Sequence, residues 1–357
     1  MPRATTATLH TDALRHNLAL LRAQAPRSRV MAMVKADAYG HGMERVARAL
    51  PQADAFGVAA LSEARRLRDA GIRQPVLLLP GFDEPADIQQ LRELSVSTTV
   101  HQAGQLQMLE QAPSGAPVDC WLKVDSGMHR LGFPPGQVRD AHARLAALPG
   151  VGEIVLMNHF ASSDEPGSAV TQVQMRVFAE ATAGLAGARS LANSAAVFDC
   201  PEAHADWLRP GGTLYGMSLV EGRTGADHGL RAAMSFHTRL IAVHRIARGE
   251  RIGYSGTWTC PEDMPVGVAA VGYGDGYPRA APSGTQVLVG GRRVPLVGRV
   301  SMDLVTLDLR GAPDARVGAP VLLWGPELPV EHIAVAAGTI GYDLTCGVTS
   351  RVRRDED

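Results

Sequence analysis

Short apolar segments alternate with amphipathic ones along the first two thirds of the chain. The apolar segments have the length of buried strands and fall at residues 30–34, 55–60, 76–79, 96–100, 119–124, 154–160, 189–193 and 212–216. Helical periodicity fills the intervals at 62–70, 86–94, 103–111, 137–148 and 170–186. Eight strand–helix units within about 200 residues favour a closed parallel barrel over an open sheet. We therefore predict an α/β fold that begins with a (β/α)8 barrel of the TIM type.

The pattern changes near residue 232. Short β-rich segments follow, separated by glycine and proline, at 235–243, 266–271, 286–289, 304–309 and 321–324. A single helical segment, 330–337, interrupts them. Such a pattern is typical of a mostly antiparallel β-structure. A chain of 357 residues is also longer than one core usually organises, so we expect two domains, 1–232 and 233–357.

Charge and cysteine content argue against several classes of protein. The 35 basic and 36 acidic side chains nearly balance, so no overall field would attract nucleic acid or an anionic membrane. No apolar segment approaches the length of a membrane span, and the first residues lack the pattern of a signal peptide. Cys120, Cys200, Cys260 and Cys346 lie far apart without a CxxC pair. We expect reduced thiols, no metal site and a cytoplasmic location.

Polar residues gather where the predicted strands end. In a parallel barrel, catalytic groups lie at the carboxyl ends of the strands. The residues at or just after these ends are Lys35, Lys123, Asp125, Arg130, His159, Asn193 and Ser194. Arg209 precedes the glycine pair Gly211–Gly212.

The segment VMAMVKADAYGHG, residues 30–42, ends an apolar strand on Lys35. A lone lysine at such a place more often extends its ammonium group into solvent. When it is buried, however, a lysine amine loses its proton more easily and can attack a carbonyl carbon to form a Schiff base. The strand-end position favours this second interpretation. Tyr39, in the glycine-rich loop that follows, could bind a phosphate.

Other strand ends carry side chains that could bind anions or transfer protons. The RPGG segment at 209–212 is either a plain turn or a backbone that presents N–H groups to an anion, to which Ser194 could add a hydroxyl. Arg130 could bind a carboxylate through its planar guanidinium, although surface arginines are more common. His159 is equally consistent with a buried structural histidine and with an acid or base.

Two segments of the second domain place tyrosines among glycines. They are RIGYSGTW at 251–258 and VGYGDGYPR at 271–279. Turns and β-bulges with half-buried tyrosines would explain them. The alternative is that these tyrosines are presented to a site.

Nine segments together resemble the alanine racemases, which are pyridoxal-phosphate enzymes of fold type III. They are VMAMVKADAYGHG, LKVDSGMHRLGF, NHFASSD, LANSAA, RPGGTLYG, RIGYSGTW, VGYGDGYPR, VGRVSMD and TIGYDLTC. One such segment would be weak evidence, whereas nine in family order along nearly the whole chain are highly specific. LANSAA and GYDLTC look more like the catabolic type than the biosynthetic type.

The resemblance implies a site for pyridoxal 5′-phosphate. Lys35 would bind the cofactor covalently, and Arg209 would face its pyridine nitrogen with His159 in support. A guanidinium cannot accept a proton and would keep that nitrogen unprotonated. The residues around the phosphate would be Tyr39, Ser194, Gly211, Gly212 and Tyr342. Gly212 departs from the family pattern, which often has a β-branched residue there.

The resemblance also implies racemisation of alanine by two bases. Lys35 would take the Cα proton of D-alanine, and Tyr254 that of L-alanine. In this family the tyrosine comes from the partner subunit, so the active unit would be a homodimer with shared active sites. Arg130 and the backbone N–H of Met302 would bind the substrate carboxylate. The product would supply peptidoglycan, or the enzyme would catabolise alanine.

Further residues match supporting positions of the family. Lys123 matches a carbamylated lysine that orients Arg130. Tyr273 and Tyr342 resemble entrance or pocket tyrosines, and Asp303 is a further supporting residue. Arg299 and Ile340 match an outer gate of the pocket.

Two other functions are consistent with parts of this pattern. One is a related enzyme on the same plan, either a broader amino-acid racemase or a basic-amino-acid decarboxylase; GYSGTW and GYGDGYPR favour a racemase. The other is a non-catalytic pyridoxal-phosphate carrier built on a single barrel. The β-rich second domain with Tyr254 argues against the carrier.

Overall fold

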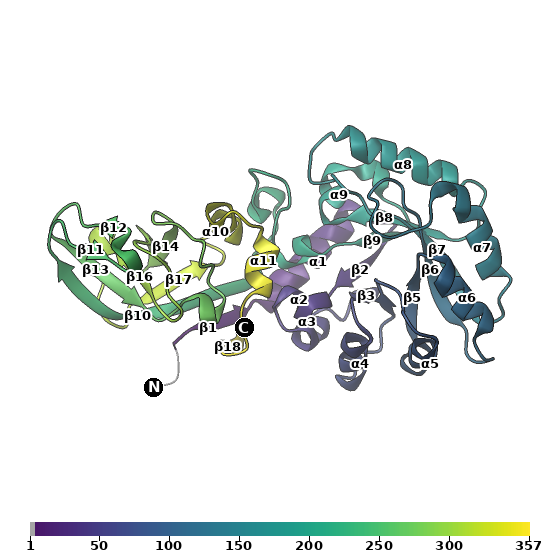
Figure 1. Cartoon of the computed structure of the whole chain (residues 1–357), viewed down its shortest axis with the longest axis horizontal. Coiled ribbons are helices and arrows are strands. Elements are labelled where there is room, and N and C mark those ends of the chain that lie inside the picture. Colours follow the sequence, from purple (N-terminus) through teal and green to yellow (C-terminus); the bar gives the residue numbers. More distant parts are fainter. Residues whose placement is uncertain (1–3) are drawn as a thin grey trace.

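The computed structural model describes residues 4–357 and consists of a barrel and a sheet-rich part beside it (Figure 1). This arrangement confirms the predicted fold class. We call the sheet-rich part, which contains β1 and β10 to β18, the β-domain. Within residues 4–357, no helix combines the length and the apolar composition needed to cross a membrane.

Parallel strands close the barrel in the order β2 to β9, and β9 pairs with β2. The strands are β2 (Arg29–Met33), β3 (Ala55–Val58), β4 (Val76–Leu78), β5 (Val96–Val100), β6 (Val118–Lys123), β7 (Val151–Met157), β8 (Ala188–Asn193) and β9 (Trp207–Arg209). The helices of this part are α1 (Thr11–Gln24), α2 (Lys35–Tyr39), α3 (Met43–Ala49), α4 (Leu61–Asp69), α5 (Pro85–Leu94), α6 (Ala103–Gln111), α7 (Val138–Ala146), α8 (Ala169–Ala181) and α9 (Ser194–Asp199).

The prediction of the last barrel strand at 212–216 is wrong. The strand that closes the barrel is β9, and Gly212–Tyr215 forms a 3-10 turn instead. Two adjacent glycines weaken a strand, and Gly216 ends the turn in the left-handed region at φ 83°. The buried hydroxyl of Tyr215 donates to the carbonyl of Met33 at 2.8 Å, which ties the turn to β2.

Side chains fill the centre of the barrel. Alternate residues of the strands form a separate buried cluster made of Met31, Met33, Ala55, Leu77, Trp121, Val155, Met157 and Trp207. The rings of Trp121 and Trp207 lie 5.6 Å apart. A barrel packed in this way has no central channel, so a ligand must bind at one of its ends.

The β-domain is built around one long strand. β10 (Met234–Ile246) pairs with β1 (Thr6–Leu9), β13 (Met264–Ala269) and β17 (Pro320–Trp324). The other elements are β11 (Arg251–Ile252), β12 (Trp258–Thr259), β14 (Gln286–Val289), β15 (Arg292–Pro295), β16 (Val305–Asp308), β18 (Arg353–Glu356), α10 (Val330–Ala337) and α11 (Gly341–Cys346). Its pairs are antiparallel apart from β1 with β18.

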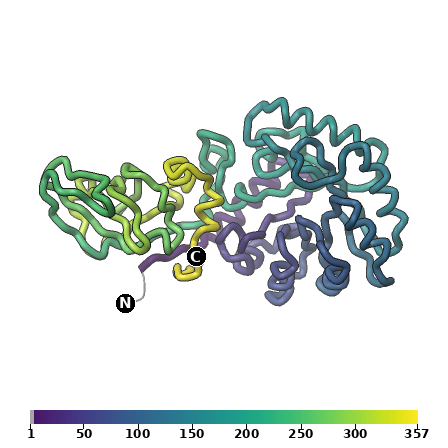
Figure 2. Tube along the Cα trace, in the orientation of Figure 1, coloured from purple at the N-terminus to yellow at the C-terminus, as the bar shows by residue number. Residues whose placement is uncertain are grey.

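Both ends of the described chain enter the sheet of the β-domain. β1 precedes the barrel in sequence, yet it lies between β10 and β18. Figure 2 shows the first segment in purple and the last in yellow meeting at the junction of the two parts. The sequence pattern does not indicate this crossing, because a four-residue strand carries little periodicity.

Candidate active site

The carboxyl ends of the barrel strands surround a cavity of about 440 Å³. Residues from several strand ends line it, and most of the predicted site residues are among them: Lys35, Tyr39, Lys123, Arg130, His159, Ser194, Arg209, Gly211 and Tyr342. These residues meet in the folded chain because the carboxyl ends of parallel barrel strands lie at the same end of the barrel.

Lys35 directs a partly buried amine into this cavity. Burial lowers its pKa most, and the nearby Arg130 lowers it further, whereas the carboxylate of Glu63 opposes the shift. A lowered pKa increases the share of the neutral amine near pH 7. The neutral form is the one that attacks carbonyl carbons and accepts protons.

A left-handed helical turn follows Lys35. Residues 36–39 have φ angles between 52° and 55°, although none of them is glycine. This conformation costs about 1–2 kcal/mol per residue, so the surrounding structure must hold it in place. Gly40 ends the turn, and a Cβ on Gly40 would lie 1.9 Å from the carbonyl oxygen of Thr345 in α11. Only glycine therefore lets the turn pack this closely against α11.

The turn places Tyr39 among other aromatic rings. Its ring centroid lies 5.1 Å from that of Tyr215 and 5.2 Å from that of Tyr342. Burial raises the pKa of Tyr39 and of Tyr342, so both hydroxyls keep their protons at neutral pH. Tyr39 and Tyr342 are thus hydrogen-bond donors at the edge of the cavity.

The glycine pair after β9 lies against these tyrosines. The N–H of Gly211 donates to the hydroxyl of Ser194 at 2.7 Å. A Cβ on Gly211 would come within 2.5 Å of the Tyr39 hydroxyl, and one on Gly212 within 1.9 Å of Tyr342 Cε1. A side chain therefore fits at neither Gly211 nor Gly212. Without side chains there, hydroxyl groups and backbone N–H groups face the same small space.

Arg209 is buried at the end of β9. Its guanidinium donates to the carbonyl oxygens of Asn158 at 2.6 Å and Leu191 at 3.3 Å, and to the hydroxyl of Ser190. Burial lowers the pKa of Arg209 to about 10, so it remains a cation at neutral pH. These three acceptors fix the orientation of the charge.

His159 lies in the same cavity, but within residues 4–357 it makes no direct hydrogen bond to Arg209. Among the described residues, the hydrogen bonds of Arg209 go to the acceptors named above and not to the imidazole. Burial and the charge of Arg209 hold the pKa of His159 well below its ordinary value. His159 is therefore neutral and can accept or donate one hydrogen bond.

Lys123 and Arg130 form a basic edge of the cavity. Burial, followed by the charges of Arg209 and Arg130, lowers the pKa of Lys123 to about 7. A large fraction of the Lys123 amine is then neutral near pH 7. Arg130 lies in the exposed loop after β6, where its guanidinium can contact a ligand anion.

The predicted site residues of the β-domain do not line this cavity. Tyr254 is 72% exposed, Met302 52% and Tyr273 39%. Tyr254 lies between β11 and β12, which Figure 1 shows at the end of the β-domain away from the barrel. Tyr254 therefore cannot reach the cavity of its own chain.

A short ionic network holds the loops of Tyr273 and Met302. Arg351 donates to Asp275 at 2.8 Å and to Asp303. Asp275 is buried and also accepts from the N–H of Gly272 at 2.9 Å. Sequence reasoning missed Arg351, and its place in the charged segment TSRVRRDED was no signal of this role.

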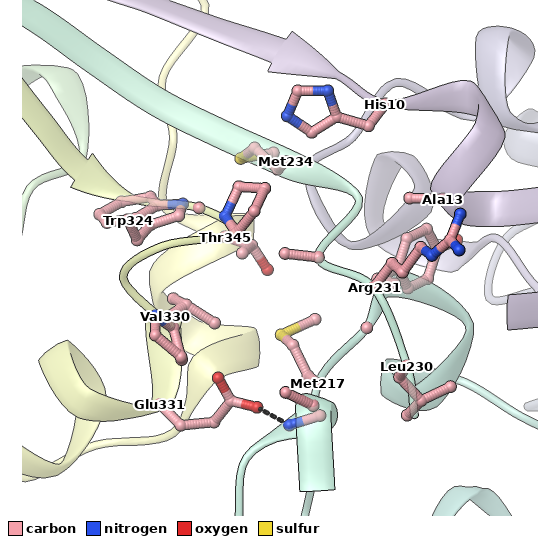
Figure 3. Close-up of a pocket in the computed structure, with 18 of the residues that line it drawn as sticks. His10, Ala13, Met217, Leu230, Arg231, Met234, Trp324, Val330, Glu331 and Thr345 are labelled. Atoms are coloured by element: carbon pink, nitrogen blue, oxygen red, sulfur yellow. Dashed lines mark hydrogen bonds between the residues drawn. The ribbon is translucent and has the colours of Figure 1, made fainter. Parts of the chain in front are cut away.

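A second cavity, of about 360 Å³, lies between the barrel and the β-domain (Figure 3). Apolar side chains such as Met217, Trp324 and Val330 form much of its wall. Glu331 of α10 accepts hydrogen bonds from the N–H groups of Ser218 and Gly225, each at 2.9 Å, which joins the two domains. None of the predicted site residues lines this cavity, and the barrel mouth therefore remains the candidate active site.

Comparison with known proteins identifies the family of the chain. Two family models match the chain: "Alanine racemase, N-terminal domain" over residues 9–219 and "Alanine racemase, C-terminal domain" over residues 233–356. The chain is 54% identical to an alanine racemase of Nitrosococcus oceani, with 98% of each chain covered. It is 52% identical to one of Shewanella baltica, with 97% of each covered.

Solved structures give the same result. The biosynthetic alanine racemase from Pseudomonas aeruginosa superposes with a TM-score of 0.97 at 45% identity, over 99% of both chains. The alanine racemase from Acinetobacter baumannii superposes with a TM-score of 0.94 at 35% identity, over 99% of this chain and 100% of the other. The chain therefore belongs to the alanine racemase family.

Proposed function

We propose that this chain interconverts L-alanine and D-alanine with the help of pyridoxal 5′-phosphate. Its family membership supports this isomerase activity and this cofactor. The observation that carries the proposal is the amine of Lys35, which has a lowered pKa and shares one cavity with Arg209 and the hydroxyl of Ser194. When bound, the cofactor withdraws electrons from the Cα of the amino acid and so acidifies its proton.

The residues at the barrel mouth fit this cofactor. Lys35 supplies an amine for its aldehyde, and the buried cation of Arg209 would face its ring nitrogen and could not accept a proton. Because Gly211 and Gly212 have no side chains, there is room for a phosphate beside their backbone N–H groups. The groups that would bind the phosphate belong to Tyr39, Ser194, Gly211, Gly212 and Tyr342.

Two bases on opposite faces of Cα would carry out the reaction. From D- to L-alanine, the amine of Lys35 would take the Cα proton and the hydroxyl of Tyr254 would deliver a proton to the opposite face. From L- to D-alanine, the phenolate of Tyr254 would take the proton and the ammonium of Lys35 would deliver one. Because Tyr254 is exposed and far from its own barrel, we propose that it serves the site of a second copy.

The substrate carboxylate would bind to Arg130 and to the backbone N–H of Met302 from the second copy. Arg130 has an exposed side chain in a loop, so it needs a partner to hold it. The pKa of about 7 at Lys123 leaves neutral amine that can react with carbon dioxide. The resulting carbamate would be an anion beside Arg130 and would orient its guanidinium.

We propose a homodimer with shared active sites. Tyr254, Tyr273, Met302 and Leu304 are large apolar or aromatic side chains that the single chain leaves exposed, and a second copy would cover them. Ile340 is exposed as well, at 57%, and with Arg299 would form the outer gate of the pocket. In this arrangement residues 1–232 bind the cofactor and residues 233–357 supply the second base, with β1 (Thr6–Leu9) extending the sheet of the second domain.

The metabolic role is a separate matter. The preference for the catabolic type has no support, since the Pseudomonas aeruginosa structure with a TM-score of 0.97 is titled biosynthetic. A supply of D-alanine for peptidoglycan is therefore the role that we propose. We place the enzyme in the cytoplasm, and the four free cysteines, three of them buried, are consistent with that location.

A single incubation tests the proposed activity. The purified protein is mixed with pyridoxal phosphate and L-alanine in deuterated water, and optical rotation and Cα deuteration are followed. We expect rotation to fall to zero while deuterium enters both enantiomers. A protein that binds the cofactor without Cα exchange would favour the carrier. Parallel reactions with serine and lysine measure the breadth of specificity.

A further inference from the structure

Glu63 connects the residue after Lys35 to the neighbouring strand of the barrel. It lies in the first turn of α4, where a negative charge is favourable. Its Oε1 accepts a hydrogen bond from the N–H of Ala36 at 2.8 Å, and its Oε2 accepts one from the N–H of Ala59 at 2.7 Å. Ala59 directly follows β3, and Ala36 is the first residue of the left-handed turn. One carboxylate thus ties the turn to α4 and to the end of β3.

The same helix contacts the turn a second time. Arg66 donates to Asp37 Oδ1 at 2.9 Å and to Glu44 Oε1 at 2.8 Å. Asp37 Oδ1 also accepts from the N–H of Met43 at 3.1 Å. Two successive residues of the turn are therefore bonded to α4, and only the contact of Glu63 reaches the backbone next to Lys35.

We propose that Glu63 is a positioning residue that keeps residues 36–39 left-handed and so fixes the Lys35 amine relative to the Tyr39 hydroxyl. This inference rests on the proposed function, which assigns these two groups to opposite ends of one cofactor. Glu63 does not line the cavity. Its charge raises the pKa of Lys35, and its hydrogen bond to the N–H of Ala36 holds the turn. Without its carboxylate, the N–H of Ala36 loses its acceptor, and the turn can relax towards the right-handed conformation that L-residues prefer.

The first test is Glu63→Gln in the full-length protein. Glutamine keeps the size of the side chain, but it loses the charge and must turn an NH2 group towards one of the two N–H donors. We expect the Kd for pyridoxal phosphate to rise by about tenfold or more, with an altered visible absorbance of the holoenzyme and an unchanged urea midpoint. The matched control is Glu93→Gln in α5, where the carboxylate contacts the exposed Gln89. It should bind the cofactor like the wild type.

A rescue variant separates positioning from general damage. Ala36 is exposed, so Ala36→Gly removes no packing, and glycine takes the left-handed conformation without steric cost. In the Glu63→Gln background, Ala36→Gly should lower the Kd for pyridoxal phosphate at least about threefold. Glycine reduces the backbone strain of the left-handed turn, which the carboxylate of Glu63 otherwise offsets. Two results would overturn the proposal. One is a Glu63→Gln protein that binds pyridoxal phosphate as tightly as the wild type, and the other is a loss of affinity that Ala36→Gly does not reduce.

A third readout needs neither a variant nor the cofactor. Hydrogen–deuterium exchange of the unmodified protein should show slow exchange at the N–H groups of Ala36 and Ala59, because both are bonded to Glu63. Fast exchange at Ala36 would contradict the proposal, even where the variants fail to fold. A wild type that does not exchange the Cα proton of alanine would instead contradict the proposed function and leave this readout unaffected.

Discussion

At the scale of single residues, the site depends on side chains whose protonation is shifted by burial. Burial lowers the pKa of Lys35 and brings that of Lys123 to about 7, whereas Arg209 keeps its charge with a pKa of about 10. The two amines therefore lose their protons more easily than in solution, beside an Arg209 that stays a cation near pH 7. Neighbouring basic groups add to the shift of both lysines.

Lys35→Ala should remove both proposed roles of the amine. The cofactor would no longer be held covalently, and one face of Cα would lack its base. We expect the visible absorbance of the bound cofactor to be lost and racemisation to fall by at least about 10²–10⁴-fold, the usual contribution of an acid–base group. Absorbance spectra and polarimetry measure the two effects. A variant that kept both would remove Lys35 from the mechanism.

Tyr254→Phe should affect one face of the substrate. Phenylalanine keeps the ring and removes the hydroxyl, so racemisation should slow by about 10²–10⁴-fold in both directions. D-alanine should still exchange its Cα proton through Lys35, whereas L-alanine should not. Nuclear magnetic resonance in deuterated water distinguishes the two enantiomers. Equal exchange in both would mean that another group is the second base.

Lys123 should make the stability of the protein depend on pH. Its pKa is about 7 in the folded chain, well below the ordinary lysine value of about 10.4. The unfolded chain therefore binds more protons between these values, and the penalty for burying Lys123 is full below pH 7 and fades as the pH rises towards 10. In buffer free of carbon dioxide, Lys123→Met should raise the urea midpoint more at pH 6 than at pH 9. The same gain at both values would contradict the shifted pKa.

Sequence reasoning located most of these residues for a simple reason. Lys35, Lys123, His159, Ser194 and Arg209 follow apolar segments, and the ends of parallel strands meet at one edge of a barrel. It could not show the left-handed turn, because nothing in the letters ADAY requires positive φ. Glu63 was also missed, since its partner in the turn, Ala36, lies 27 residues away in sequence.

At the scale of elements, short turns after strands shape the site. The turn of residues 36–39 and the turn Gly212–Tyr215 both follow barrel strands, and both pack on tyrosines. Most predicted helices and strands agree with the structure within a few residues, since their periodicity is local. The closing strand was placed too late because Trp207–Arg209 is only three residues long and ends on a charge.

Gly212→Ala tests how closely these turns pack. A Cβ at this position would lie 1.9 Å from Tyr342 Cε1, so the tyrosine would have to move. Overpacking of this kind costs about 1–3 kcal/mol, which corresponds to a rise of about five- to 150-fold in the Kd for pyridoxal phosphate. A fluorescence titration measures it, and Gly136→Ala, where no atom lies within 4 Å of the added Cβ and φ is not positive, controls for the loss of a glycine. Unchanged affinity would show that the position of Tyr342 does not matter for the cofactor.

At the scale of the whole molecule, each chain would contribute to two different active sites of the proposed homodimer. The barrel mouth carries Lys35, whereas the β-domain presents Tyr254 at its far end (Figure 1). The sheet that includes both β1 and β18 joins the two parts into one unit. The sequence could indicate two domains from the change of pattern, but the crossing of β1 depends on long-range pairing that no local pattern reports.

The central claim is that Lys35 and Tyr254 of different copies act on one substrate, and mixing two inactive variants tests it most directly. Lys35→Ala and Tyr254→Phe proteins are unfolded together, refolded and assayed for alanine racemisation. About half of the dimers are then mixed, and each mixed dimer has one intact site, so about a quarter of wild-type activity should return. Activity no higher than that of the two variants assayed separately would show that the site is not shared between copies.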